Sequence, residues 1–358
     1  MKAVIIAGGS GTRLRPLTYN TPKPMMPLFE KPFLQHQLEW LRRQGITSVI
    51  INLHYLSDAI ANYFGDGSSL GMEIVYSLEE NPMGTAGAVK LAAEHFDGDP
   101  MVVINGDILT DVDLKQLLSV HHSKQAQATL MMLRVTDPTS YGLVFTETDG
   151  RIIRFLEKPS WDEATVDTVN AGIYVLSPEI FDYVPEREAF SFERGLFPLL
   201  LKLDARVYGV TTGAYWIDIG SPGKYLQAHS DILMGRVEVE LPATKHGQGV
   251  WLAPGVEIDP SAEIRGPAYI GSRSRIRKRA SVREFSVIGD DVTVDDRAII
   301  ERALVGAKST IGEDAVIHQC IVGQRCVIGA AAKLGHHLVL ADDSVLGRGT
   351  HLAASSGL

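Results

Sequence analysis

The sequence predicts a mainly parallel, doubly wound α/β sheet of the Rossmann-like type, followed by a left-handed parallel β-helix. Between residue 1 and about residue 235, short apolar segments alternate with amphipathic ones, which is the order of strands and helices in a parallel sheet covered on both faces. From residue 252 onward an aliphatic residue returns every six positions, a period that neither helices nor ordinary strands have. We therefore expect a first domain at residues 1–235, a linker at 236–251 and a β-helix domain at 252–358.

The elements of the first domain follow from apolar segments and from the turn-forming residues between them. Residues 2–7 are a short apolar run, as expected of a strand covered on both faces. A loop at 79–87 is rich in turn formers and leads into a predicted helix at 88–96. Residues 142–158 have the pattern of a hairpin with an Asp-Gly turn. Further strands are predicted at 48–53, 72–77 and 101–105, and from Asn170 onward.

The aliphatic residues of the last third keep their spacing with two breaks. In a parallel β-helix such residues stack inside a three-sided coil, and each short strand with its turn forms one side. The spacing shortens by one position before Val305 and again before Val322. The repeating residues are Leu252, Ile258, Ile264, Ile270, Ile276, Val282, Ile288, Val294, Ile300, Val305, Ile311, Ile317, Val322, Ile328, Leu334, Leu340, Leu346 and Leu352.

Four histidines in this repeat raise the question of a second activity. β-Helices of this sequence type also occur in acyltransferases, in which a histidine can act as general base. No acid or base partner is visible beside these histidines, so we expect them to pack between coils or to lie at the surface. We expect the β-helix to bury an interface between subunits of a homo-oligomer, or to position a regulatory site. The histidines are His318, His336, His337 and His351.

Composition excludes several classes of protein. The formal net charge is −9, so no basic surplus exists to bind nucleic acid or anionic membranes in general. The apolar run after Met1 is too short for a signal peptide, and no later run is long enough to span a membrane, so we expect a cytoplasmic protein. Two cysteines, Cys320 and Cys326, can form neither a disulfide framework nor a metal motif.

The loop after the first strand has the composition of a phosphate clamp. Three glycines lie between residues 8 and 11, where they let the backbone approach a ligand, and its N–H groups can face phosphate oxygens. Arg13, Arg15 and Lys23 follow, and such cations suit a nucleoside triphosphate that loses pyrophosphate. A dinucleotide fingerprint is excluded because Leu14 replaces its third small residue, and a P-loop is excluded because no Gly-Lys-Ser/Thr follows.

Carboxylates at strand ends are the candidate metal ligands. Asp107 follows the apolar strand 101–105, so it lies at the edge where open parallel sheets bind ligands. An aspartate there is a natural magnesium ligand, although it could also cap a turn. Asp218 lies among apolar neighbours, where an unpaired carboxylate is costly and an ion beside it would remove that cost.

The motifs of the first domain resemble a known signature. They are AGGSGTRLRPLT at 7–18, PKPM at 22–25, ENPMGTAG at 80–87, NGD at 105–107, FLEKP at 155–159, NAGIYV at 170–175 and WIDIG at 216–220. Together they resemble the sugar-1-phosphate nucleotidylyltransferases, or nucleoside diphosphate sugar pyrophosphorylases. Within this family the chain is most similar to the mannose-1-phosphate guanylyltransferases.

The resemblance implies a role for each matching residue. Arg13 and Lys23 correspond to the groups that bind the triphosphate, Lys158 to the lysine that binds the sugar phosphate, and Asp107 and Asp218 to the ligands of Mg²⁺. The residues implied at the nucleotide are Ala7, Gly8, Gly9, Gly11, Thr12, Glu79, Glu80, Gly84, Thr85 and Gly106. Those implied at the sugar are Gly142, Glu157 and Asn170.

The loop at 79–87 bears on the choice of base. Thymidylyl and many uridylyl relatives resemble one another in having glutamine at the position of Glu79. Guanine presents two adjacent donors, N1–H and the exocyclic amine, and a carboxylate from Glu79 or Glu80 accepts both. This favours GTP, although both glutamates could also be solvated loop charges.

The reaction expected from the resemblance needs no general base. A sugar 1-phosphate is ionised at neutral pH, so its oxygen can attack the α-phosphorus of a nucleoside triphosphate and displace pyrophosphate in line. The products expected are GDP-mannose and pyrophosphate. The alternatives are a glucose-1-phosphate uridylyl-, thymidylyl- or adenylyltransferase, a catalytically silent regulatory subunit, and a bifunctional enzyme with acetyltransferase activity.

Overall fold

A computed structural model describes residues 1–353, and the expected end of the β-helix at 354–358 lies outside the described residues. The chain forms two compact units. The sheet unit contains Met1–Ser10, Pro22–Pro24 and Leu34–Trp216, and the β-helix unit contains Gly11–Thr21, Met25–Phe33 and the chain from Ile217 onward. The division of the chain at 235 and 252 stays a prediction, since the chain passes between the two units several times before residue 235.

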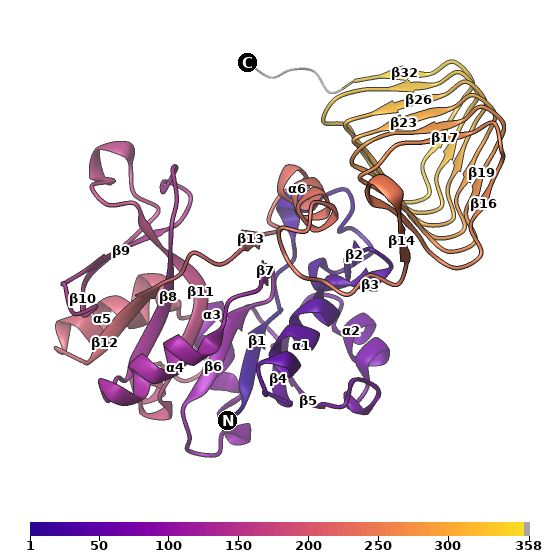
Figure 1. Ribbon diagram of the computed structural model, residues 1–358. Helices are drawn as coiled ribbons and strands as arrows, with labels where there is room; N and C mark the ends of the chain where they lie inside the picture. Colours follow the sequence, from indigo (N-terminus) through magenta and orange to yellow (C-terminus); the bar gives the residue numbers. More distant parts are fainter. Residues whose placement is uncertain (354–358) are drawn as a thin grey trace. The chain divides into compact units, whose positions relative to one another are not determined.

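A nine-stranded mixed sheet organises the sheet unit, with the main order β10-β9-β11-β6-β1-β4-β5. The strands β6, β1, β4 and β5 are parallel and lie side by side (Figure 1). The hairpin of β9 and β10 and the long strand β11 are antiparallel to their neighbours, β8 pairs antiparallel with β11, and β12 pairs parallel with β8. The strands are β1 (Ala3–Ile6), β4 (Ser48–Leu53), β5 (Glu73–Leu78), β6 (Met101–Asn105), β8 (Ala128–Arg134), β9 (Gly142–Thr146), β10 (Ile152–Glu157), β11 (Thr168–Leu176) and β12 (Val207–Thr211).

The predicted strands at 48–53 and 101–105 are confirmed, whereas the helix predicted at 88–96 was placed too late. This helix, α3, begins at Gly84 because the N–H groups of Ala86 and Gly87 donate to the carbonyl of Phe190 at 2.9 and 3.0 Å. A partner so distant in the chain gives no local sequence signal. The helices are α1 (Phe33–Arg43), α2 (Ser57–Phe64), α3 (Gly84–Leu91), α4 (Leu114–Ser123), α5 (Phe197–Lys202) and α6 (Pro222–Leu233).

Short strands outside the main sheet are β2 (Pro27–Leu28), β3 (Lys31–Pro32), β7 (Ile108–Thr110), β13 (Trp216–Asp218) and β14 (Thr244–His246). The stretch predicted as a linker holds β14 and the start of β15, which pair antiparallel. None of the helices within residues 1–353 is both long and apolar enough to cross a membrane.

The last third of the described chain is a left-handed parallel β-helix of three sheets (Figure 1). One coil takes 18 residues where Ile258 lies beside Ile276, and 17 where Val294 lies beside Ile311, as the first break in the aliphatic spacing requires. The sheets contain β15 (Val250–Leu252), β18 (Ala268–Ile270), β21 (Ser286–Ile288), β24 (Leu304–Val305), β27 (Ile321–Val322) and β30 (Val339–Leu340); β16 (Glu257–Ile258), β19 (Arg275–Ile276), β22 (Thr293–Val294), β25 (Thr310–Ile311), β28 (Val327–Ile328) and β31 (Val345–Leu346); and β17 (Glu263–Ile264), β20 (Ser281–Val282), β23 (Ile299–Glu301), β26 (Val316–His318), β29 (Lys333–Leu334) and β32 (His351–Leu352).

The interior of the β-helix is filled by the predicted aliphatic residues, with small residues and cysteines between them. Cys320 and Cys326 are buried free thiols, and burial raises the pKa of Cys320 to about 12. The rings of His318 and His336 pack edge to face with centroids 4.8 Å apart, in keeping with a packing role.

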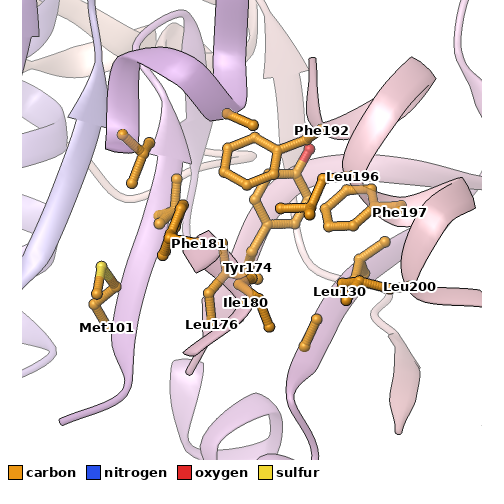
Figure 2. Packing of buried hydrophobic residues seen from close by; sticks show 14 of the residues in the cluster. Met101, Leu130, Tyr174, Leu176, Ile180, Phe181, Phe192, Leu196, Phe197 and Leu200 are labelled. Atoms are coloured by element: carbon orange, nitrogen blue, oxygen red, sulfur yellow. The ribbon is translucent and has the colours of Figure 1, made fainter. Parts of the chain in front are cut away.

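The core of the sheet unit holds a cluster of aromatic side chains. Figure 2 shows Tyr174, on β11, packed beside Phe192 and Phe197, whose ring centroids lie 5.5 and 5.2 Å from its own. Tyr174 is fully buried, so its hydroxyl must find partners within the protein. This cluster therefore couples β11 to the segment that begins α5.

Candidate active site

The glycine loop begins where β1 ends. The N–H of Ala7 continues the parallel pairing by donating to the carbonyl of Asn52 at 3.0 Å, and Gly8 follows as the chain leaves the sheet. A Cβ on Gly8 would lie 2.7 Å from Oε1 of Glu79 and 3.2 Å from Cβ of His54. Only glycine lets the loop run this close to the Glu79 carboxylate. Gly9 is exposed, and a Cβ there would meet nothing within 4 Å.

Glu79 lies directly after β5, at the same carboxyl edge of the parallel strands. Its side chain is only 6% exposed, and its Oε2 accepts the N–H of Met83 at 2.9 Å. Burial raises the pKa of Glu79, while the Met83 bond acts in the opposite direction. Glu80 is exposed to solvent. The structure therefore distinguishes the buried Glu79 from the exposed Glu80, a distinction that the sequence did not make.

Gly84 and Thr85, also predicted at the nucleotide, contact the segment at residues 190–193. Gly84 has a left-handed φ of 68°, and a Cβ there would lie 2.7 Å from the carbonyl oxygen of Phe190. The hydroxyl of Thr85 accepts the N–H of Phe192 at 2.8 Å and donates to the carboxylate of Glu193 at 2.9 Å. Packing within the protein therefore accounts for both residue types.

Asp107 and Lys23 form an ion pair at the end of β6. The Lys23 Nζ lies 2.5 Å from Oδ2 of Asp107, and the two side chains are 11% and 28% exposed. Gly106 lets β6 end close to β1, since a Cβ would lie 2.7 Å from the carbonyl oxygen of Ile6. The structure thus joins two residues, predicted separately as a phosphate ligand and a metal ligand, that are 84 positions apart.

The residues predicted at the sugar come from the antiparallel half of the sheet. Glu157 pairs with Gly142 across the hairpin, and a Cβ on Gly142 would lie 2.8 Å from a Glu157 carboxylate oxygen. Burial raises the pKa of Glu157, helped by the charge of Glu193. Lys158 is exposed with a left-handed φ of 49°, a strained conformation for a residue with a side chain. Asn170 lies on β11 at a bulge in the pairing with β8.

The other predicted residues belong to the β-helix unit. Gly11 has a left-handed φ of 60° and precedes the helical turn of Thr12 and Arg13, which are both exposed. A Cβ on Gly220 would lie 2.9 Å from a carboxylate oxygen of Asp218 and 3.0 Å from a guanidinium nitrogen of Arg13, so these two side chains converge there.

Asp218 and Arg15, which belong to the same unit, have contacts that the sequence analysis did not predict. Asp218 forms an ion pair with Lys224, in the first turn of α6. The Arg15 guanidinium, whose role the sequence left open, lies over the ring of Tyr19 at 5.3 Å.

The fit of a divalent cation can be judged from the donor atoms. Within residues 1–353 no group of three or more His, Cys, Asp or Glu side chains could hold a metal ion. Mg²⁺ is usually held by one or two carboxylates together with water and substrate phosphates, so a protein cage is not required. Asp107 accepts from Lys23 through Oδ2, and the oxygen chemistry of a carboxylate fits the ion.

Sequence reasoning missed Glu193, Tyr174, Gly220 and Lys224. Gly220 could have been noticed because it ends the WIDIG segment, and Lys224 because it follows that segment by four residues. Tyr174 lies in the NAGIYV motif but was given no role there, and Glu193 gave no signal, since its contact with Thr85 spans 108 residues.

An α/β sheet with a glycine loop, a lysine and an aspartate at the carboxyl ends of parallel strands is of the nucleotide-binding class. A family model described as Nucleotidyl transferase matches residues 2–235, and one described as GMPPB C-terminal domain matches residues 247–356. The chain belongs to the nucleotidyl transferase family. Members of this family generally use a divalent metal.

Named relatives agree with this family. A mannose-1-phosphate guanylyltransferase from Mycobacterium tuberculosis is 41% identical over 65% of this chain and 65% of its own length. A UTP–glucose-1-phosphate uridylyltransferase from Synechocystis is 37% identical over 72% of this chain and 68% of its own length. The crystal structure of HddC from Yersinia pseudotuberculosis complexed with GMP-PN has a TM-score of 0.56 at 31% identity and covers 64% of this chain and 99% of its own.

Proposed function

We propose that this protein condenses GTP with mannose 1-phosphate to give GDP-mannose and pyrophosphate. Family membership supports the reaction class, and the observation that carries the choice of base is the buried Glu79 carboxylate beside Gly8. Each carboxylate oxygen has two lone pairs, so the bond from Met83 leaves acceptors for both donors of guanine. Relatives named mannose-1-phosphate guanylyltransferases support both the base and the sugar.

The proposed reaction is an in-line displacement. An ionised oxygen of mannose 1-phosphate attacks the α-phosphorus of GTP, and the bond from that phosphorus to the bridging oxygen of pyrophosphate breaks. Lys23 and Arg13 neutralise the charge of the triphosphate and of the departing pyrophosphate. Lys158 binds the sugar phosphate, and Glu157 and Asn170 bind the sugar hydroxyls.

We propose Mg²⁺ as the divalent cation, with Asp107 and Asp218 as its protein ligands. When bound, Mg²⁺ would neutralise charge on the phosphate groups. Each carboxylate is oriented by a lysine, Asp107 by Lys23 and Asp218 by Lys224. This orientation reduces the entropy that either carboxylate would lose on binding the ion.

The test is the release of pyrophosphate by the full chain with Mg²⁺, across ATP, GTP, CTP, UTP and dTTP against mannose and glucose 1-phosphates. Release with GTP and mannose 1-phosphate alone is the expected result. Release with UTP or dTTP and glucose 1-phosphate would overturn the choice of substrates, and no release with any pair would favour a silent regulatory subunit.

A pair of variants tests the base assignment directly. Glu79→Gln should lower the preference for GTP over UTP by about tenfold or more, since a hydrogen bond to a charged group contributes about 1.5–3 kcal/mol. Glu80→Gln changes the charge by the same amount on the neighbouring exposed side chain and should leave this preference unaltered. Equal changes in the two variants would show that Glu79 does not contact the base.

A further inference from the structure

The segment at residues 190–193 is bound along the loop that opens α3. The Phe190 N–H donates to the carbonyl of Met83 at 2.8 Å, and the Phe190 carbonyl accepts from the first helical amides of α3. The Phe192 N–H donates to the hydroxyl of Thr85 at 2.8 Å. The loop predicted at the nucleotide is therefore fixed to this segment by backbone bonds and by one side chain.

Glu193 is the charged group at the end of this segment. Its Oε2 accepts from the hydroxyls of Thr85 at 2.9 Å and Ser191 at 2.6 Å, and its Oε1 accepts from the hydroxyl of Tyr174 at 3.3 Å. One carboxylate thus receives hydrogen bonds from the loop of α3 and from β11. Hydrogen bonds to an ionised acceptor are the stronger kind, so these contacts hold both elements.

The contact with Tyr174 continues to Asn170. The Asn170 Nδ2 donates to the Tyr174 hydroxyl at 2.8 Å, and the Asn170 Oδ1 accepts the N–H of Gly172 at 3.0 Å. A hydroxyl has a single proton, and Tyr174 gives it to Glu193. The Tyr174 oxygen is then the acceptor for Asn170, which sets the direction of the Asn170 amide.

The surroundings of Tyr174 keep this chain of hydrogen bonds in one geometry. The ring is fully buried and packs beside Phe192 and Phe197 (Figure 2). The charge of Glu193 also acts on Glu157, the carboxylate predicted at the sugar. Glu193 is therefore connected to two residues of the proposed sugar site and one of the proposed nucleotide site.

We propose that Glu193 is a positioning residue that links the nucleotide and sugar sites, through Thr85 on one side and through Tyr174 and Asn170 on the other. This inference rests on the proposed function. Removal of the Tyr174 hydroxyl breaks only the link to the sugar site through Asn170. Removal of the Glu193 carboxylate breaks that link and also the link to the nucleotide site through Thr85.

The test compares Tyr174→Phe, Glu193→Ala and the double variant by steady-state kinetics of pyrophosphate release from GTP and mannose 1-phosphate. Tyr174→Phe should raise the KM for mannose 1-phosphate about tenfold, as the loss of one oriented hydrogen bond predicts, and leave the KM for GTP within about twofold. Glu193→Ala should raise both KM values. In the double variant, Tyr174→Phe should add nothing to the effect of Glu193→Ala, because both changes break the same link.

Controls separate positioning from folding. Tyr183→Phe and Glu179→Gln change an exposed hydroxyl and an exposed carboxylate of the same unit, and neither should alter a KM value. Melting curves of every variant show that it folds. A merely structural role would lower the melting temperature without separating the two KM values.

The results that would overturn the positioning role of Glu193 differ from the result that would overturn the proposed function. An unaltered KM for mannose 1-phosphate in Tyr174→Phe, an equal rise of both KM values, or additive effects in the double variant would overturn the inference while leaving the proposed function intact. A wild-type protein that releases no pyrophosphate would overturn the proposed function, and the inference with it.

Discussion

The pH dependence of stability should be governed in part by Asp290, in the β-helix unit. The Ser272 N–H donates both to Oδ1 of Asp290 at 2.9 Å and to Oε1 of Glu30 at 2.8 Å, which brings two carboxyl groups together. The pKa of Asp290 is raised from 3.8 to about 7, mainly by burial. A hydrogen bond with Glu30 and the negative charge of Glu30 act in the same direction. Asp290 therefore keeps a proton in the folded protein at pH values where the unfolded chain has lost it.

The sign of the effect follows from proton binding. Because the folded protein binds this proton more tightly, the free energy of unfolding falls as the pH rises from about 4 to about 7, and this contribution is level above that range. The full shift corresponds to about 4 kcal/mol at about 1.4 kcal/mol per pKa unit. Asp290 is only half-buried, so solvent screening reduces this to about 1–2 kcal/mol.

Asp290→Asn removes the titration and keeps the local hydrogen bonds. The amide oxygen can still accept from Ser272, and the amide nitrogen can donate to Glu30 at every pH. At pH 8 the variant should melt about 2–8 °C above the wild type, since 1 kcal/mol moves the melting temperature of a domain of this size by about 2–4 °C. At pH 5 the fall in stability is only about a third complete, so the variant should melt only about 1–3 °C above the wild type.

Calorimetric melting of the full chain at pH 5 and pH 8 is the measurement, and Asp291→Asn is the matched control. Asp291 is paired with Arg273 at 2.7 Å, a hydrogen bond that lowers its pKa, so its loss at pH 8 should be neutral or slightly destabilising. The reasoning about Asp290 is refuted if Asp290→Asn melts below the wild type at pH 8, or if the two differ equally at both pH values.

Three further predictions concern the two units separately. In Gly8→Ala the new Cβ must displace the Glu79 carboxylate, so the KM for GTP should rise about tenfold with little change for the sugar phosphate; steady-state kinetics that show an equal rise for both would contradict this. Ile300→Ala leaves a cavity at a fully buried position of the β-helix and should lower the free energy of unfolding by about 2–5 kcal/mol in calorimetry. Val345→Ala, at a side chain 73% exposed, should lower it by less than about 0.5 kcal/mol. Similar losses in the two variants would show that the interior is not close-packed. Asp107→Asn should lower turnover by about a hundredfold or more with an unchanged melting temperature, and turnover restored by excess Mg²⁺ would remove Asp107 from the proposed ligands.

Much of the fold was predictable because its signals are local. The strands at 48–53 and 101–105 were placed from apolar runs, and the shortened spacing before Val305 reappears as coils of 17 residues. The roles proposed for the individual site residues remain predictions. The structure does show that two residues predicted separately, Lys23 and Asp107, are in contact.

By itself, the amino-acid sequence determined the β-helix and the positions along the chain of strands in the parallel half, because hydrophobic periodicity acts over a few residues at a time. Tertiary structure alone decided that α3 begins at Gly84, since the carbonyl that accepts its first amides belongs to Phe190. It also decided that Glu79 is buried while Glu80 is exposed, and that Glu193 contacts Thr85, which is 108 residues earlier. Such contacts depend on how whole elements pack together, and no local pattern of residues encodes a partner that distant.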